Sequence, residues 1–342
     1  MMEFEPFSVT LERPLETARG AIHERAGFVI RTTYEDVTGI GEATPLAGWT
    51  ESQTECRDAL ERASNVATEL DWGVALARLD APAARHGLSL AFADARARAA
   101  RMPLYRSLGG PTQTESVPVN ATLGAQGTPE QTASEARQLS EDGYRCLKVK
   151  VGTRSVEEDI ERIRAIRDTL GDTLRIRVDV NGAWTTSEAE TAVDALAALD
   201  VSYVEQPLPA GELEATRSLR NRGVDIALDE SLATYDIETI IDNAAADVLV
   251  LKPMVLGGPD LTVTAARACR EAGIEPVVST TIDAVVARTA AVHVAASIPE
   301  IRPCGLATAD WLATDIGLDP SPIENGRIHV PQEPGLGIEG VG

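Results

Sequence analysis

The sequence predicts an α/β fold, a (β/α)8-type barrel preceded by a smaller α+β domain. From Val117 onward, short β-branched runs alternate with amphipathic helical stretches. Polar residues end these runs at intervals of 29, 26, 24, 23 and 27 residues. A repeat of one strand and one helix gives parallel strands joined by right-handed crossovers. Within residues 1–43, strand-like segments instead follow one another directly.

The smaller domain is predicted from the segments that precede the junction at 109–117. The segments FSVTL, GFVIRTTY and VTGIGEA within 1–43 are alternating or β-branched, which predicts antiparallel strands. Apolar residues recur at helical spacing around 51–70 and 88–101. The stretch 109–117 is rich in Gly, Pro and Thr and marks a domain junction.

The predicted barrel strands are VNATLG, CLKVKVG, RIRVDVNG, SYVEQP, DIALDES, DVLVLKP, EPVVSTT and RPCGLAT. An open doubly wound sheet is the alternative architecture. No G-x-G-x-x-G turn follows the first strand, which disfavours a dinucleotide-binding sheet. The C-terminal residues contain Pro, Gly and the strand-like RIHV, and we expect them to return to the first domain.

Charge and composition exclude several classes of protein. Lys and Arg total 31 against 53 Asp and Glu, a formal net charge of −22, which repels nucleic acid and anionic lipid. No apolar run approaches the roughly 20 residues of a membrane span. The N-terminal MMEFEPFSVTLERP lacks the regions of a signal peptide. We expect a cytoplasmic protein whose partner is a small molecule, with its oligomeric state left open.

Lysine and cysteine usage carry further information. Only three lysines stand against 28 arginines, which in so acidic a chain is typical of a halophilic protein. GC-rich codon bias is the alternative. A lysine kept in such a chain is expected to do what arginine cannot, such as lose its proton near neutral pH. The cysteines form no C-x-x-C pair and are expected as small buried hydrophobes, at Cys56, Cys146, Cys269 and Cys304.

Three consecutive barrel strands end in carboxylates, at Asp179, Glu205 and Asp229. In a parallel barrel the C-terminal strand ends converge on the active site, so these acids are expected to lie close together. Like charges at that distance need a cation between them. Oxygen ligands without His or Cys favour Mg²⁺, with Mn²⁺ as the alternative. For Asp229 alone, a helix N-cap is the alternative role.

The lysines are expected to face these acids. Lys148 and Lys150 are two apart in one strand and therefore share a face, while Lys252 ends a strand across the barrel. This arrangement suits removal of a proton alpha to a carboxylate, because a divalent cation stabilises the resulting enediolate. Cationic surroundings and partial burial lower the pKa of a lysine toward neutrality and make it a competent base. Ion pairing to the acids is the alternative role of the lysines.

The ordered motifs Lys-x-Lys, Asp-x-Asn, Glu-Gln-Pro, Asp-Glu-Ser and Lys-Pro resemble the enolase superfamily, in its muconate-lactonizing subgroup. The resemblance covers nearly the whole chain. GIGEATPLAGWTES at 39–52 is similar to the strand and loop that close these sites, and 87–110 to the helices before the barrel. It implies a capping domain at 1–112, a modified barrel at 113–310 and a segment at 311–342 that packs back on the capping domain.

The resemblance also implies roles for single residues. The implied Mg²⁺ ligands are Asp179, Glu205 and Asp229. Lys150 matches the general base, Lys148 its electrostatic partner, and Lys252 the lysine that faces the enediolate. A mandelate-racemase pattern would need a His-Asp dyad on the sixth and seventh strands, and the histidines stand elsewhere, at His23, His86, His293 and His329.

Within the subgroup, GEATPLAGWTES, VVSTTIDAVVARTAAVHVAASIP and GLATADWLATDI are most similar to the o-succinylbenzoate synthases. This implies Mg²⁺-dependent syn-dehydration of 2-succinyl-6-hydroxy-2,4-cyclohexadiene-1-carboxylate in menaquinone biosynthesis. The implied substrate-binding residues are Asn181, Ser279, Thr280 and Thr281. A cap on the following helix is the alternative role of the three hydroxyls. Asp283 beside them would have to point away from an anionic substrate.

Other activities of the same superfamily remain as alternatives. Dipeptide epimerases usually carry Asp-x-Asp at the end of the eighth strand, where this chain has Gly305-Leu306-Ala307-Thr308. N-acylamino acid racemase, dipeptide epimerase and muconate cycloisomerase are the alternative enzymes. A non-catalytic binding barrel is more remote, because every implied ligand and lysine is present.

Overall fold

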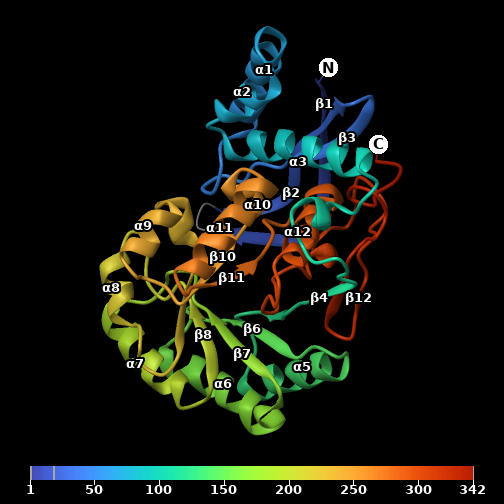
Figure 1. Cartoon of the computed structure of the whole chain (residues 1–342). Helices are drawn as coiled ribbons and strands as arrows, with labels where there is room; N and C mark the ends of the chain where they lie inside the picture. The colour runs from blue at the N-terminus through green and yellow to red at the C-terminus, as the bar shows by residue number, and fades with distance from the viewer. Residues whose placement is uncertain (1, 18–19, 342) are drawn as a thin grey trace.

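The computed structural model describes residues 2–17 and 20–341. Figure 1 shows an antiparallel sheet with its helices at one end of the molecule and a parallel sheet surrounded by helices at the other. The chain therefore has the predicted α/β fold, with an N-terminal capping domain beside a parallel barrel-like sheet. The expected limits at 112/113 and 310/311 stay predictions.

The capping sheet has the order β1-β2-β3 within the described residues, and both pairs are antiparallel. Its strands are β1 (Met2–Thr17), β2 (Gly20–Tyr34) and β3 (Val37–Ala43). Its helices are α1 (Gln53–Glu69), α2 (Trp72–Ala77), α3 (Pro82–Ala99) and α4 (Leu104–Ser107). Helix α3 starts earlier than the apolar pattern predicts, because Pro82 occupies its first turn, where a missing N–H costs nothing.

Helix α3 packs directly on the backbone of β3. A Cβ on Gly41 would lie 1.9 Å from the carbonyl oxygen of Gly87, and one on Gly39 would lie 2.2 Å from that of Ala91. No side chain fits in this space, so the two glycines of GIGEA allow the close approach. This contact holds β3, which leads into the loop 44–52, directly against α3.

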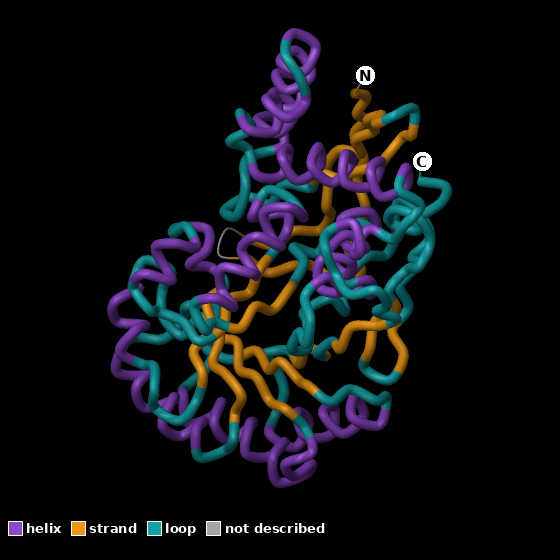
Figure 2. The backbone as a smooth tube through the Cα atoms, in the orientation of Figure 1, coloured by secondary structure: helices purple, strands orange, loops and turns teal. Residues whose placement is uncertain are grey.

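Seven parallel strands form one sheet in chain order within the described residues. They are β5 (Ala121–Leu123), β6 (Cys146–Lys150), β7 (Arg175–Asp179), β8 (Val201–Glu205), β9 (Asp225–Leu228), β10 (Val248–Leu251) and β11 (Glu275–Val278). The connecting helices are α5 (Pro129–Glu141), α6 (Val156–Leu170), α7 (Thr186–Ala197), α8 (Leu213–Ser218), α9 (Ile237–Asp242), α10 (Pro253–Leu256), α11 (Pro259–Glu271) and α12 (Val285–Ser297). Figure 2 shows these helices around the outside of the strands.

The eighth predicted strand, RPCGLAT, is reduced to single bridges, although all of its residues are described. Cys304 pairs with Val119 and Gly305 with Ser279, so this segment joins the last strand to the beginning of the first. Pro303 has no N–H to donate to a ladder, which limits regular pairing here. The ring is thus closed by a segment that is not itself a regular strand.

The C-terminal residues first pair with the segment that precedes the first barrel strand and then contact the capping domain. Strand β13 (Arg327–His329) pairs with β12 (Ile323–Glu324) and with β4 (Ser116–Pro118). Further on, the Leu104 N–H donates to the Gly335 carbonyl at 2.8 Å, and the Leu336 N–H donates to Asp94 at 2.8 Å. Three short 3₁₀ turns complete the described elements, at Gly171–Thr173, Glu230–Ala233 and Ala309–Trp311.

The outer face of β6 is apolar, as the sequence predicts. Leu147, Val149 and Val151 are buried among the helices, whereas Lys148 and Lys150 lie on the other face. The four cysteines are buried and free, which confirms their expected role as small hydrophobes. None of the helices in the described ranges has the length and apolar character to cross a membrane.

His293 of α12 lies in the core between the C-terminal segment and α4. Its Nδ1 accepts the Tyr105 N–H at 3.3 Å, and its Nε2 donates to the Leu336 carbonyl at 3.2 Å. This hydrogen bonding requires a neutral imidazole, because a second ring proton would displace the Tyr105 N–H. Burial lowers the pKa of His293 to about 4.

We expect His293 to reduce stability under acid conditions. Between about pH 6.5 and about pH 4 the unfolded chain binds a proton that the folded chain does not, so stability falls as the pH falls through this window. The loss reaches about 3 kcal/mol at most. Urea unfolding at several pH values should show a shallower acid slope for His293→Gln than for the wild type. Equal slopes would contradict this account.

The net charge of −22 predicts salt-dependent stability. Screening of repulsion between carboxylates should raise the melting temperature by several degrees between dilute buffer and molar KCl. Thermal unfolding followed by circular dichroism measures this effect. A melting temperature that does not change with KCl would count against the halophilic interpretation and favour codon bias as the source of the low lysine content.

Candidate active site

Charged side chains from neighbouring strands meet at one end of the parallel sheet. In the ladder, Lys150 of β6 lies beside Asp179 of β7, and Asp179 lies beside Glu205 of β8. Asp229 follows the last residue of β9. The side chains of Asp179 and Glu205 are fully buried and that of Asp229 is nearly so. Parallel strands in register therefore bring the three predicted acids together.

Lys148 and Lys150 approach the acids from β6. The Lys148 Nζ lies 2.8 Å from Asp179 Oδ2 and 2.7 Å from Glu205 Oε1. The Lys150 Nζ lies 2.7 Å from Asp179 Oδ2 and donates to Asn181 Oδ1 at 2.7 Å. Lys150 is the more exposed of the two, with a side chain 34% exposed against 15% for Lys148. Lys150 is thus the one better placed to meet a substrate.

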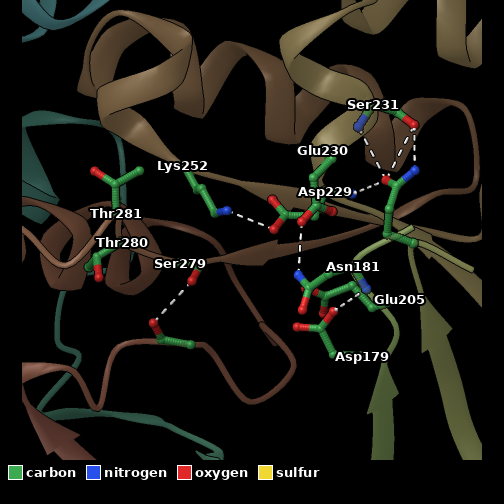
Figure 3. Close-up of polar contacts among 12 residues, drawn as sticks. Asp179, Asn181, Glu205, Asp229, Glu230, Ser231, Lys252, Ser279, Thr280 and Thr281 are labelled. Carbon is green, nitrogen blue, oxygen red and sulfur yellow. Dashed lines mark hydrogen bonds and ion pairs between the residues drawn. The ribbon is translucent and has the colours of Figure 1, made fainter. Parts of the chain in front are cut away.

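Lys252 enters from the other side of the acids, directly after β10. Its Nζ lies 2.6 Å from Asp229 Oδ2, and Figure 3 shows it directed at that carboxylate. The same ammonium lies 3.7 Å from the centre of the Trp49 ring, a cation–π contact. Trp49 belongs to the loop after β3, so the capping domain contributes directly to the site. Sequence reasoning identified this loop but not the contact.

The acids and lysines change one another's pKa values. Burial, together with the charges of Asp179 and Asp229, raises the pKa of Glu205 to about 7 against the opposing effect of Lys148. Burial raises the pKa of Asp229 to about 6, with Lys252 opposing. Burial also acts to raise the pKa of Asp179, but the two β6 lysines hold it below its ordinary value. The lysines therefore leave the negative charge at Glu205 and Asp229 incompletely compensated.

Lys148 cannot act as a base, because its pKa is raised. Burial alone would lower its pKa, but Asp179 and Glu205 raise it well above the ordinary value. The Lys148 ammonium therefore stays protonated. It can hold negative charge in place but cannot accept a proton.

The donor atoms suit a hard cation. Asp229 Oδ1 is buried and, in the part of the chain that the structure describes, has no hydrogen-bond partner. The three carboxylates offer only oxygen, the donor that Mg²⁺ prefers. As the described side chains stand, no three His, Cys, Asp or Glu residues are grouped to hold a metal ion. The carboxylates are instead paired with the ammonium groups of Lys148 and Lys252.

Two amide side chains position this end of the sheet. Asn181 Nδ2 donates to Glu230 Oε1 at 2.8 Å (Figure 3). The Asn181 oxygen accepts from Lys150, so the amide connects Glu230 with Lys150. Gln206 Oε1 accepts the N–H groups of Asp229 and Ser231, each at 3.1 Å. The Gln of Glu-Gln-Pro thereby fixes the turn that carries Asp229. Sequence reasoning missed this role, because Glu-Gln-Pro by itself does not indicate such a turn.

The three hydroxyls after β11 bond within the protein. Ser279 Oγ donates to the Gly305 carbonyl at 3.2 Å, and Thr280 Oγ1 lies 3.0 Å from Thr308 Oγ1. Thr281 Oγ1 donates to the carboxylate of Asp283. Asp283 is buried, with Arg25 of the capping domain at 3.9 Å. A direct role of these hydroxyls in substrate binding stays a prediction.

The alternative that these hydroxyls cap the next helix is wrong. Helix α12 has no side-chain cap of its own at Ala284. Two N–H groups at its start donate to Glu42 of β3, from Ala284 at 2.9 Å and from Ala287 at 2.8 Å, and the Val285 N–H between them donates to Asp315 at 2.9 Å. A carboxylate from the capping domain therefore takes the place of a local cap and joins the two parts of the molecule beside the site.

Comparison with known proteins defines the family. The family model described as "Enolase C-terminal domain-like" matches residues 131–340. The chain therefore belongs to the enolase superfamily, in the subgroup of muconate-lactonizing enzymes. The L-Ala-D/L-Glu epimerase structure from Bacillus subtilis superimposes with a TM-score of 0.87 at 26% identity, covering 100% of this chain and 99% of that one. A dipeptide epimerase from Enterococcus faecalis, solved with Mg and a dipeptide, gives 0.87 at 27% identity, covering 99% of each.

Relatives of known activity are enzymes with different reactions. Chloromuconate cycloisomerase CbnB of Cupriavidus necator is 29% identical, covering 99% of this chain and 96% of its own length. The N-succinyl-L-Arg/Lys racemase of Bacillus cereus is 34% identical, covering 75% and 69%. The o-succinylbenzoate synthase of Thermobifida fusca is 40% identical, covering 62% and 66%. The family is thus one of enzymes that includes cycloisomerases, racemases and a synthase.

Proposed function

We propose that this protein is an o-succinylbenzoate synthase, a Mg²⁺-dependent lyase of menaquinone biosynthesis. The observation that carries this proposal is the 40% identity to the Thermobifida fusca synthase over 218 residues, against 34% over 266 residues for the racemase and 29% over 361 residues for the cycloisomerase. The site agrees in its chemistry, because it combines a Lys-x-Lys strand, three buried acids and a lysine on the opposite side. The substrate would be 2-succinyl-6-hydroxy-2,4-cyclohexadiene-1-carboxylate.

In the proposed reaction, Lys150 acts as both base and acid. Its neutral amine takes the proton alpha to the ring carboxylate, and the released electron pair gives an enediolate. The ring double bond then forms as hydroxide leaves from the neighbouring carbon, and the same ammonium returns the proton to it as water. Base and leaving group lie on one face, which makes the elimination syn. Lys150 ends neutral, and the product is aromatic.

The other charged groups stabilise this chemistry without transferring a proton. Mg²⁺ held by Asp179, Glu205 and Asp229 would supply positive charge against the substrate carboxylate. Lys148 remains an ammonium, as its raised pKa requires. Lys252, fixed between Asp229 and Trp49, faces the substrate space from the side opposite Lys150.

N-acylamino acid racemisation is the second candidate. Its supporting observation is that lysines reach the acids from both sides, with Lys150 at β6 and Lys252 after β10. A racemase needs this arrangement, since one lysine removes the alpha proton and the other delivers a proton to the opposite face. The 34% identity to the N-succinyl-L-Arg/Lys racemase points the same way.

The test is turnover of the cyclohexadiene substrate, with Mg²⁺ in molar KCl and an EDTA-treated control. Formation of o-succinylbenzoate that depends on the metal is the expected result. A parallel incubation with N-succinyl amino acids in D₂O detects racemase activity as deuterium at the alpha carbon. Activity in the second assay alone would replace the synthase by the racemase. A folded, Mg²⁺-binding sample that is inactive in both assays would contradict both candidates.

A further inference from the structure

A buried ion pair on α6 lies directly behind the strand that carries Lys150. Arg162 has no exposed surface and Asp159 is almost as deeply buried. Arg162 Nη1 lies 3.2 Å from Asp159 Oδ1, one helical turn away. Neither residue reaches the acids of the site, so the reaction described above does not use them. Burying two charges on the outer side of a barrel strand costs free energy unless further hydrogen bonds compensate for it.

The pair holds the backbone on both sides of Lys150. Arg162 Nη1 donates to the carbonyl of Lys150 at 3.0 Å. Asp159 Oδ2 accepts the N–H of Gly152, two residues further on, at 2.8 Å. Arg162 therefore fixes the peptide group that follows the proposed base, and Asp159 fixes the turn after it.

Arg162 also connects the Lys150 backbone to the loop after β5. Its Nη2 donates to the Gly124 carbonyl at 2.6 Å, and its Nε donates to Thr132 Oγ1 at 3.2 Å. The turn after Lys150 is closely packed. A Cβ on Gly152, whose φ is +86°, would lie 2.9 Å from the Ala183 Cβ. The backbone at Lys150 is thus held from the helix, from the loop after β5 and from the loop after β7.

We propose that Arg162, paired with Asp159, is a positioning residue that fixes the direction of the Lys150 side chain. The inference rests on the proposed function in so far as it takes Lys150 to be the base. Proton transfer needs the amine within hydrogen-bond reach of the alpha proton. A displacement of about 1 Å can reduce a rate by about 10²-fold. Loss of the guanidinium frees the Lys150 carbonyl and allows such a displacement.

Helix α6 offers a matched control in Arg167. This guanidinium donates to backbone carbonyls in the same way, to Leu199 at 3.0 Å, to Leu174 at 3.0 Å and to Asp200 at 2.9 Å. Those carbonyls lie before β7 and β8, at the end of the sheet away from the acids. Arg167→Met therefore removes a similar set of hydrogen bonds from the same helix without touching the segment around Lys150.

The experiment compares Arg162→Met and Arg167→Met with the wild type. We expect Arg162→Met to lower kcat by about 10²-fold with KM changed less than about threefold, and Arg167→Met to lower the melting temperature without a comparable loss of kcat. Because Arg162→Met leaves the buried Asp159 carboxylate with Arg154, 4.0 Å away, as its cationic partner, Asp159→Asn/Arg162→Met serves as a second variant. It removes both charges but keeps an oxygen for the Gly152 N–H. This double variant should lose the same kcat.

A second readout does not depend on activity. The chain has only three lysines, so ε-¹³C-lysine labelling gives a simple NMR spectrum. The Arg162 variants should shift the Lys150 signal and leave the Lys252 signal in place, whereas Arg167→Met should shift neither. A wild type without turnover would remove the proposed function but not this test. Folded Arg162 variants with an unshifted Lys150 signal, or an equal loss of kcat in Arg167→Met, would overturn the proposal.

Discussion

Replacement of Lys150 by alanine is expected to lower turnover by at least about 10³-fold. Among the described residues, Lys150 is the lysine that contacts both Asp179 and Asn181 and is also partly exposed, and the variant loses it. Lys148 cannot take over as base, because its neighbours hold its pKa well above the ordinary value. Steady-state kinetics with the cyclohexadiene substrate measures the effect. Circular dichroism and Mg²⁺ titration should show an intact fold and metal affinity.

Arginine at the same position separates catalysis from ion pairing. Lys150→Arg keeps a cation beside Asp179 but cannot lose its proton near neutral pH. If Lys150 is the base, the arginine variant is as inactive as the alanine variant. If Lys150 only balances the charge of the acids, the arginine variant should approach wild-type turnover. Substantial activity in either variant would refute the assignment of Lys150 as the base.

The main features of the site could be predicted because the ends of parallel strands lie side by side, so that regular spacing in the sequence indicates which residues are neighbours. Polar residues at regular intervals marked the strand ends, and strands in register place Lys150, Asp179 and Glu205 side by side. Two lysines separated by one apolar residue had to share the inner face of β6. These inferences need only the period of a strand and the topology of the sheet.

Contacts between distant segments could not be predicted in the same way. The ring of Trp49 reaches Lys252 across two domains, and Glu42 caps α12 from the capping sheet. Neither contact leaves a local periodic signal. Gln206 depends on a backbone turn with φ +42°, which nothing in Glu-Gln-Pro requires. The spacing of Asp159 and Arg162 allowed an ion pair, but only the packing of α6 on β6 shows that it holds Lys150.

Replacement of Asp229 by asparagine is expected to weaken Mg²⁺ binding and lower kcat/KM, each by about 10²-fold at low Mg²⁺. The substitution keeps the shape of the side chain but removes its charge. It also replaces one of the two carboxylate oxygens by an NH2 group, which cannot bind a cation, in a side chain whose Oδ1 is buried without a hydrogen-bond partner among the described residues. Lys252 loses its ion-pair partner as well and keeps only Trp49. Calorimetric Mg²⁺ titration and kinetics at increasing Mg²⁺ measure the two effects.

Asp247→Asn is the matched control for this prediction. Asp247 lies before β10, at the other end of the sheet, where its Oδ1 pairs with Arg220 at 2.6 Å and its Oδ2 accepts the Ile226 N–H at 2.9 Å. Its loss should cost stability but leave Mg²⁺ affinity unchanged. High Mg²⁺ should restore part of the activity of Asp229→Asn, because only one of three oxygen donors is weakened. Equal Mg²⁺ affinity in Asp229→Asn and the wild type would show that Asp229 is an ion-pair partner of Lys252 and not a metal ligand.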